Sequence, residues 1–152
     1  NEVMANPLGP EPADEWIEII NAGTASATMV GWKLRDQAGE VEVPNLLLEP
    51  GALVLLVRND FVGGQAGDIA PRAGTTLVRL ASLGKNGLTN SGEALALVDG
   101  AGVVVSQFPA RASEQEGVSL ARRTPAELDD ATQSFGPHAS PGASPGATNV
   151  IE

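Results

Sequence analysis

The stretch that most constrains the fold is residues 88–108, LTNSGEALALVDGAGVVVSQF, which has the pattern of a β-hairpin. Its two apolar runs, residues 94–98 and 103–108, flank a short connection that begins at Asp99 and ends at Gly102. Asp-Gly between two β-rich runs is a strong short-range hairpin signal, because glycine readily adopts the positive φ that tight turns need. We therefore expect a chain rich in β structure.

Short apolar runs, separated by Gly and Pro, recur along the rest of the chain. This punctuation is typical of an all-β sandwich. The run at residues 52–57, ALVLLV, is apolar at every position, so we expect a strand that is covered on both faces. Further strands are expected at residues 2–5, 15–21, 30–36, 40–43, 46–48, 75–80 and 118–122.

Three stretches lack a strand pattern. Residues 59–74 are rich in Gly, Asp and Pro and predict a long excursion, a kind of loop that often binds partners. Residues 124–130 favour one short helical turn. Residues 136–149 contain a tandem Ala-Ser-Pro-Gly, the composition of an extended tail or linker. We expect a sandwich over residues 1–123 and a Pro/Ser/Gly-rich extension over residues 124–152 that packs on the same domain.

The composition excludes several classes of function. The 152 residues suffice for one domain with a packed core, and the absence of Cys excludes disulfides, a thiolate nucleophile and Cys-ligated metals. A net charge of −10 repels phosphate backbones, so no nucleic acid is expected as a partner. No apolar run approaches the roughly 20 residues of a membrane helix, so no membrane insertion is expected. Because the chain starts at Asn1, inside a strand-like run, we expect an excised domain or a processed chain.

Two features match fragments of a hydrolase site. Residues 142–146 spell the Gly-x-Ser-x-Gly motif, but a nucleophile elbow requires a strand-to-helix turn, which Pro145 and its surroundings do not favour. We interpret Ser144 as a coincidental match. His138 is the only histidine, so any triad or His-ligated metal would need it, and we expect it to be a solvated surface side chain. The sequence therefore predicts no enzyme activity, no catalytic or metal-binding residues and no cofactor.

Acidic side chains also occur inside predicted strands. Glu18 stands between two Ile residues, so it shares a strand face with Trp16. If that face is covered, the carboxylate must be hydrogen-bonded or ion-paired, with Lys33, Arg35 or a backbone amide as available partners. We expect a structural role for Glu18 and Glu2 rather than a catalytic acid pair.

Loop aspartates are candidate Ca²⁺ ligands, because calcium prefers oxygen donors. No EF-hand-type loop is present, so turn formation is the simpler interpretation. The residues concerned are Asp36, Asp60, Asp68, Asp99, Asp129 and Asp130.

The two tryptophans are candidate core residues. Trp32 stands between Gly31 and the apolar Leu34, and we interpret it as the core tryptophan of a sandwich. Trp16 is either a core residue or an exposed anchor. With no Tyr and few other aromatic side chains, the chain is poorly supplied for a stacking platform for sugars or bases.

A series of short motifs follows a recognisable order along the chain. These are residues 1–5, residues 15–19 with Asn21, then Gly31, Trp32, Lys33 and Leu34, then Leu48, Glu49, Pro50 and Gly51, then Leu88, Asn90, Gly92 and Glu93, then Asp99, Gly102 and Val103, then residues 117–120 with Arg122, and the Ser-Pro-Gly tail with its Asn. Together they resemble the lamin tail domain, an immunoglobulin-like module of nuclear lamins and of many bacterial secreted or envelope proteins. The Asn-Glu opening and the Ser-Pro-Gly ending resemble the bacterial branch.

The resemblance implies a fold and a class of function. It implies an immunoglobulin-like β-sandwich of the lamin-tail type, with Trp32, Gly31, Leu34, Pro50, Gly51, Asn90, Gly92 and Gly102 in core or turn positions. It implies an extracellular or cell-envelope location and a non-catalytic interaction or adhesion module that binds a protein or a surface polymer. Loop residues, above all residues 59–74, are the expected contacts. The alternative is an accessory domain of a secreted nuclease or phosphoesterase that positions substrate or binds a metal ion.

Overall fold

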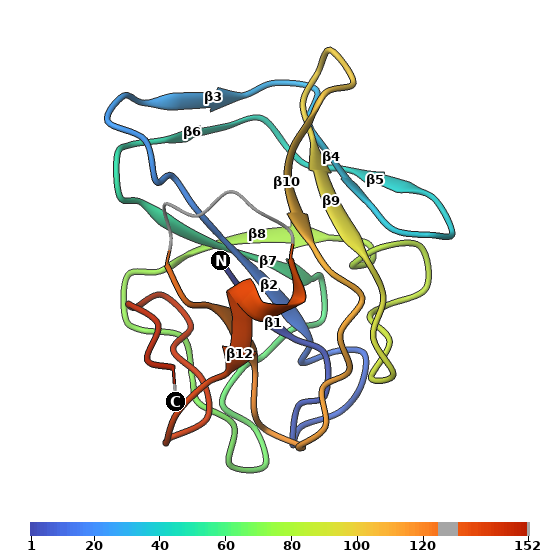
Figure 1. The fold of residues 1–152 in the computed structure, drawn as a ribbon, viewed down its shortest axis with the longest axis vertical. Coiled ribbons are helices and arrows are strands. Elements are labelled where there is room, and N and C mark those ends of the chain that lie inside the picture. Colours follow the sequence, from blue (N-terminus) through green and yellow to red (C-terminus); the bar gives the residue numbers. More distant parts are fainter. Residues whose placement is uncertain (125–130, 152) are drawn as a thin grey trace.

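The computed structural model describes residues 1–124 and 131–151, and these residues are all-β apart from one 3₁₀ turn (Figure 1). In chain order the strands are β1 (Glu2–Met4), β2 (Trp16–Ile20), β3 (Ala27–Met29), β4 (Lys33–Arg35), β5 (Glu40–Glu42), β6 (Leu46–Leu48), β7 (Leu53–Arg58), β8 (Thr76–Leu80), β9 (Leu95–Val98), β10 (Val104–Phe108), β11 (Leu120–Arg122) and β12 (Phe135–Pro137). The 3₁₀ turn η1 (Thr132–Ser134) leads into β12.

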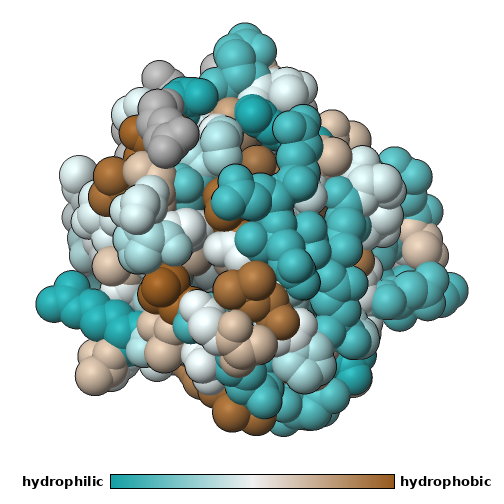
Figure 2. Space-filling view, turned by 90° about the horizontal axis from the view of Figure 1, so that it is seen from below, coloured by the Kyte–Doolittle hydropathy of each residue, from teal (hydrophilic) through white to brown (hydrophobic). Residues whose placement is uncertain are grey.

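The strands form an immunoglobulin-like β-sandwich. Within the described residues, one sheet has the order β12-β11-β1-β2-β7-β8, a second has the order β10-β9-β4-β5, and β3 pairs with β6. The β3–β6 ribbon lies at one end of the molecule in Figure 1. Seen from below, the surface is largely hydrophilic, with apolar residues in small separate groups (Figure 2). The predicted fold class is confirmed.

Each predicted strand overlaps an observed one, but β3 and β12 lie outside the predictions. The β3 sequence Ala-Thr-Met is too short to show an alternating pattern, and it is a strand because it pairs antiparallel with β6. β12 contains Gly136 and Pro137, residue types that are depleted in strands, and it is held by antiparallel pairing with β11. In both cases long-range pairing decided the structure where local preference gave no signal.

The core lies between the two large sheets, and a smaller cluster covers the other face of the larger one. The inner core includes Val3, Ile17, Val54 and Leu56 from the larger sheet and Leu34, Leu95 and Phe108 from the second sheet. The smaller cluster, here called the outer cluster, contains Met4, Trp16, Leu55, Val57, Phe61 and Ala143. Strand β7 supplies side chains to both, so its predicted burial on two faces is confirmed.

The hairpin predicted at residues 88–108 is present as β9 and β10. The Asp99 N–H donates to the carbonyl of Val103 at 2.9 Å, and the Asp99 Oδ1 accepts the N–H groups of Ala101 and Val103 at 2.9 and 2.8 Å. Gly102 has a φ of +86°, which suits glycine. Asp99 therefore fixes the turn through both its backbone and its side chain.

Positive φ also explains the other glycines singled out in the sequence. Gly31, Gly51 and Gly92 have φ values of +69°, +74° and +92°. At Gly92 an added Cβ would lie 2.5 Å from the backbone carbon of Arg111, a distance that no side chain tolerates. Glycine is needed there both for its φ and for close approach of the two segments.

The excursion over residues 59–74 follows from the topology. Strands β7 and β8 are adjacent and parallel, so the chain must cross back to the starting end of β7 over a dozen or more residues. Phe61 is buried in the outer cluster, and the Asp68 carboxylate accepts the N–H groups of Leu8 and Gly9 at 2.9 and 2.8 Å. The segment is therefore a crossover connection that also covers the larger sheet. The sequence alone predicted a loop that contacts partners and gave no sign of this structural role.

The C-terminal tail lies against the larger sheet. Beyond β12, His138 forms an isolated β-bridge with Ile151, and Ala143 is buried in the outer cluster. The Arg72 N–H donates to the carbonyl of Pro145 at 2.9 Å, which joins the tail to the crossover. The tail buries little apolar surface and is held mainly by hydrogen bonds. The division between residues 1–123 and 124–152 stays a prediction, and the helical turn predicted at 124–130 falls almost wholly outside the described residues.

Candidate functional site

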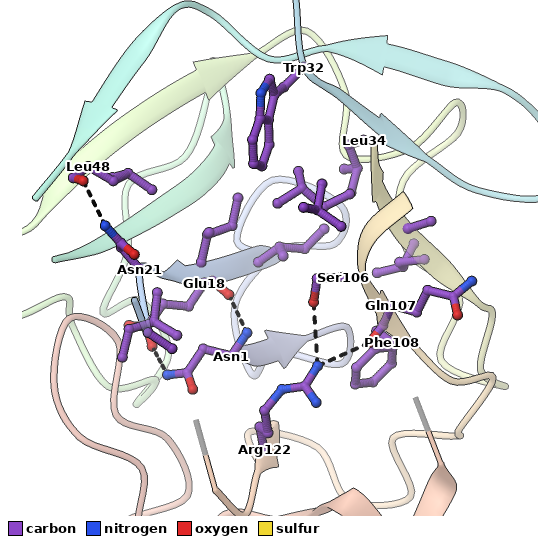
Figure 3. Close-up of a pocket in the computed structure, with 18 of the residues that line it drawn as sticks. Asn1, Glu18, Asn21, Trp32, Leu34, Leu48, Ser106, Gln107, Phe108 and Arg122 are labelled. Carbon is purple, nitrogen blue, oxygen red and sulfur yellow. Dashed lines mark hydrogen bonds between the residues drawn. The ribbon is translucent and has the colours of Figure 1, made fainter. Parts of the chain in front are cut away.

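An open cleft of about 420 Å³ separates the two large sheets beside β2 and β10 (Figure 3). Its walls are mostly apolar. The apolar lining includes Ile17, Ile19, Met29, Trp32, Leu34, Leu97 and Phe108. Protein interiors leave few voids larger than a water molecule, and binding pockets typically measure about 300–1,000 Å³. This inter-sheet cleft is therefore the candidate binding site.

Trp32 lies at one end of the cleft and is only partly buried (Figure 3). The indole packs against the inner core without being fully enclosed, because β4 begins one residue later and leaves the ring at the cleft wall. Trp16, for which two interpretations were open, is 3% exposed and belongs to the outer cluster. The buried tryptophan of this chain is therefore Trp16.

Arg122 joins the two sheets at the opposite end of the cleft. Its Nη2 donates to the carbonyl of Gln107 at 3.1 Å and lies 3.5 Å from the Ser106 hydroxyl (Figure 3). The guanidinium also lies over the Phe135 ring, 4.4 Å from its centroid, which is a cation–π geometry. The side chain thus ties β10 to β11 and gives the otherwise apolar cleft a polar end.

Glu18, at the margin of the cleft, is a buried carboxylate. It is 0% exposed, and its Oε1 accepts the side-chain amide of Asn1 at 2.6 Å while its Oε2 accepts the N–H of Gly146 at 2.6 Å. Lys33 and Arg35, the charged partners considered from the sequence, are bonded to Glu40 instead. The backbone-amide alternative is the one that the structure contains.

Glu2 is the register partner of Glu18 on the neighbouring strand, and it is also 0% exposed. Its Oε1 accepts the Ser119 hydroxyl at 2.5 Å and the Ser144 N–H at 2.9 Å, and its Oε2 accepts the Ser144 hydroxyl at 2.8 Å. We call Glu2 and Glu18 the carboxylate pair. Because most of these donors belong to the tail, the pair holds the tail against β1 and β2, which is a structural role.

Burial raises the pKa of two carboxyl groups. The pKa of Glu18 is raised from 4.5 to about 7, because burial outweighs the hydrogen bonds from Asn1 and Gly146. The pKa of Glu15 is raised to about 7 for the same reason, although its Oε2 accepts the Leu88 N–H at 2.8 Å. Both groups therefore titrate near neutral pH in the folded chain and near pH 4.5 in the unfolded chain.

This difference predicts an unusual dependence of stability on pH. Between pH 4.5 and 7 the folded chain binds protons at Glu15 and Glu18 that the unfolded chain releases. Each carboxyl group should therefore lower the free energy of unfolding by up to about 1.4 kcal/mol per pH unit as pH rises. The Asn1 amine opposes this trend above pH 5, because burial lowers its pKa from 8.0 to about 5 and the unfolded chain then binds the extra proton. The net change should be a fall of about 1.4 kcal/mol per pH unit between pH 5 and 7. Urea unfolding should show a more stable chain at about pH 5 than at about pH 7, and Glu18→Gln should flatten the curve. A free energy of unfolding that increases through this range would contradict the assignment.

The remaining hydrolase-like features do not form a catalytic arrangement. His138 is 4% exposed, so the prediction of a solvated surface side chain is wrong. Its Nε2 accepts the Val150 N–H at 3.1 Å, and its Nδ1 lies 2.7 Å from the carbonyl of Ala139 and donates to it. Val150 of the returning C-terminal segment therefore engages one ring nitrogen, and the adjacent Ala139 carbonyl engages the other. Ser144 bonds to the Glu2 carboxylate rather than to an imidazole.

Among the loop aspartates that the structure describes, Asp36, Asp68 and Asp99 accept hydrogen bonds from backbone amides, and Asp60 accepts two from the Arg58 guanidinium. Asp129 and Asp130 lie outside the described residues. Asp36 accepts the N–H groups of Ala38, Gly39 and Lys85 at 2.6 to 2.7 Å. In the described part of the chain, no three or more acidic or histidine side chains gather in a group that could hold a metal ion. Among the same residues, no helix is long and apolar enough to cross a membrane.

Sequence reasoning missed most residues that build the cleft margin and the tail contacts. Arg122, Ser119 and Gly146 stood within motifs, but no contact was predicted for them or for Gln107, because their roles depend on which strands become neighbours. One signal was present, since a Glu in an apolar run must find donors when that run is buried. The sequence does not show that one of the donors to Glu18, the Gly146 N–H, comes from the tail.

One comparison with known protein families supports the all-β sandwich that the structure shows. No curated protein matches the sequence. A family model, the Lamin Tail Domain, matches residues 1–111, which span β1 to β10 and include most of the cleft lining. Strands β11 and β12 and the tail lie beyond the matched region. The match covers well over half of an all-β sandwich, and the chain therefore belongs to the Lamin Tail Domain family.

Proposed function

We propose that this domain is a non-catalytic interaction module of a larger exported or cell-envelope protein and that it binds its partner through the inter-sheet cleft. Lamin tail domains are β-sandwiches of the interaction type and are not a catalytic family. Export is supported by the resemblance of the Asn-Glu opening and the Ser-Pro-Gly tail to the bacterial members. The observation that carries the proposal is the cleft itself, an apolar hollow within a sandwich that is otherwise closely packed.

The chemistry of the cleft suits binding better than catalysis. Its polar groups are already engaged by the fold, since Arg122 is bonded to Gln107, Glu18 to Asn1 and Gly146, and Asn21 to Leu48. Such groups are held by the fold and can orient a bound segment. The large apolar walls offer area for burial, which is the main favourable term in most protein association.

The test uses the full-length protein in its native host. Surface-restricted cross-linking on intact cells should yield a product that contains this domain. Ala27→Phe, which fills the cleft from β3, should abolish that product, whereas Thr28→Phe on the exposed face of the same strand should leave it unchanged. Protection of the domain from a surface-restricted reagent, or a product indifferent to Ala27→Phe, would overturn the proposal.

A further inference from the structure

Strand β8 forms one edge of the larger sheet, and within the described residues its only strand neighbour is β7 (Figure 1). The Asn59 N–H donates to the carbonyl of Leu80 at 2.9 Å, so the backbone groups of Leu80 face β7. Neighbouring residues of a strand direct their N–H and C=O groups to alternate sides, and those of Leu77 and Arg79 therefore face away from β7. No hydrogen bond from residues 1–124 or 131–151 reaches these four outward groups.

The other three outer strands of the two large sheets carry features that discourage an added strand. β12 has three residues, of which two are Gly and Pro. β5 also has three residues, and two of them are exposed Glu. On β10 the Gln107 carbonyl already accepts a hydrogen bond from Arg122. β8 has five residues without Gly or Pro, so it is the edge that is best suited to further pairing.

Basic side chains accompany this edge, although the whole chain has a net charge of −10. Residues 69–82, which contain β8 and the turn before it, include Arg72 and Arg79 and no acidic residue. The Arg79 guanidinium donates to three backbone carbonyls that follow β7, at 3.0 to 3.2 Å, and Arg72 is exposed. Neither arginine forms an ion pair with a described residue, and the neighbouring Arg58 and Asp60 neutralise each other. The charge at this edge therefore favours an acidic partner.

We propose that the β8 edge receives one added β-strand, an extended acidic segment of a partner protein that runs antiparallel to β8 and bonds to the outward N–H and C=O groups of Leu77 and Arg79. The acidic side chains of the segment share the sheet face of Arg79, and the alternate apolar ones share the face of Val78, next to the core. None of the residues that line the inter-sheet cleft belongs to β8. The β8 edge is thus a second interaction surface, separate from the site of the proposed function.

The experiment uses a synthetic peptide, Glu-Val-Glu-Val-Glu-Val-Glu, with the basic analogue Lys-Val-Lys-Val-Lys-Val-Lys as its control. Peptide concentrations up to about 1 mM should shift the amide resonances of Leu77 and Arg79 in the ¹⁵N-labelled chain. At about ten times the Kd, the acidic peptide should slow hydrogen exchange of both amides about ten-fold. Leu77→Pro removes one outward N–H and leaves the bonds to β7 in place, so it should weaken binding about ten-fold or more. Leu77→Thr keeps that N–H and should bind like the parent.

A second pair of variants tests the charge and replaces the first pair if Leu77→Pro does not fold. Arg72→Glu should weaken binding of the acidic peptide about five-fold, whereas Arg72→Lys should leave it unchanged. Absence of any shift at Leu77 and Arg79, or an equal response to the acidic and basic peptides, would overturn the proposal. Self-association of the chain that Leu77→Pro abolishes would also overturn it, because a second copy would then occupy the edge. Ala27→Phe fills the inter-sheet cleft and should not affect the peptide, so this proposal and the proposed function are judged separately.

Discussion

A chain that ends at Pro137 should lose about 5 kcal/mol of stability and melt at least about 10 °C lower than the full chain. The truncation removes three donors to the carboxylate pair, namely the Ser144 N–H and hydroxyl and the Gly146 N–H. Hydrogen bonds to charged groups contribute about 1.5–3 kcal/mol each, and renewed hydration of the carboxylates returns part of the loss. Removal of Ala143 also uncovers the outer cluster.

Calorimetry and urea unfolding measure this effect directly. The matched control is Ser140→Ala, an exposed substitution within the same tail that should leave the melting temperature unchanged. Limited proteolysis adds an independent readout, because a tail held by the carboxylate pair should resist cleavage in the intact chain. Rapid clipping between residues 139 and 149, with no change in melting temperature, would show that the tail is a linker, as its composition suggests.

Trp16→Ala should destabilise the chain by about 3–5 kcal/mol, because it removes a large ring from a closely packed cluster. Trp16 is 3% exposed and packs in the outer cluster, under the crossover and the tail. Trp32→Ala removes a ring of the same size from the wall of an open cleft, so its cost should be smaller, at about 1–2 kcal/mol.

Urea unfolding of the two variants side by side checks this ranking. Equal losses of unfolding free energy in the two variants, or a larger loss for Trp32→Ala, would mean that the cleft is closed around Trp32 in solution. The comparison therefore also tests whether the cleft exists as described, because a filled cleft would bury Trp32 as deeply as Trp16.

Local signals in the sequence were sufficient for the strands and turns that depend on nearby residues. The Asp99 turn, the doubly buried β7 and the glycines at positive φ all follow from hairpin chemistry, apolar runs and turn preferences. Strand β12 could not be predicted in this way, because a Phe-Gly-Pro segment becomes a strand only when β11 lies beside it. The parallel pairing of β7 and β8, which explains the length of residues 59–74, is likewise a property of the topology.

The candidate site was less accessible to sequence reasoning than the fold. That Glu18 needs a partner could be predicted, but its donor Gly146 lies 128 residues away along the chain. The exposed position predicted for His138 was wrong because Ile151 returns to pair with it, a contact that composition does not report. The cleft lies between two sheets and is lined by residues from distant parts of the chain, an arrangement that only the tertiary structure defines.

The tail and the site are physically connected, although the family match ends at residue 111. Glu18 lies two residues before Ile20 on β2, and its carboxylate is held by Gly146 of the tail. Strand β11 pairs with β1, which in turn pairs with β2 as far as Glu18. A fragment restricted to residues 1–111 would therefore lose the residues of β11, β12 and the tail that line the cleft or hold its margin.

Solvent access to the two tryptophans tests the central claim most directly, namely that an open cleft lies between the two large sheets. Trp32 lines the cleft and is partly buried, whereas Trp16 is 3% exposed. The account predicts that acrylamide quenches the fluorescence of Trp32, measured in the variant Trp16→Phe, more strongly than that of Trp16, measured in the variant Trp32→Phe. Equal quenching of the two side chains would contradict it, because the cleft would then be closed around Trp32.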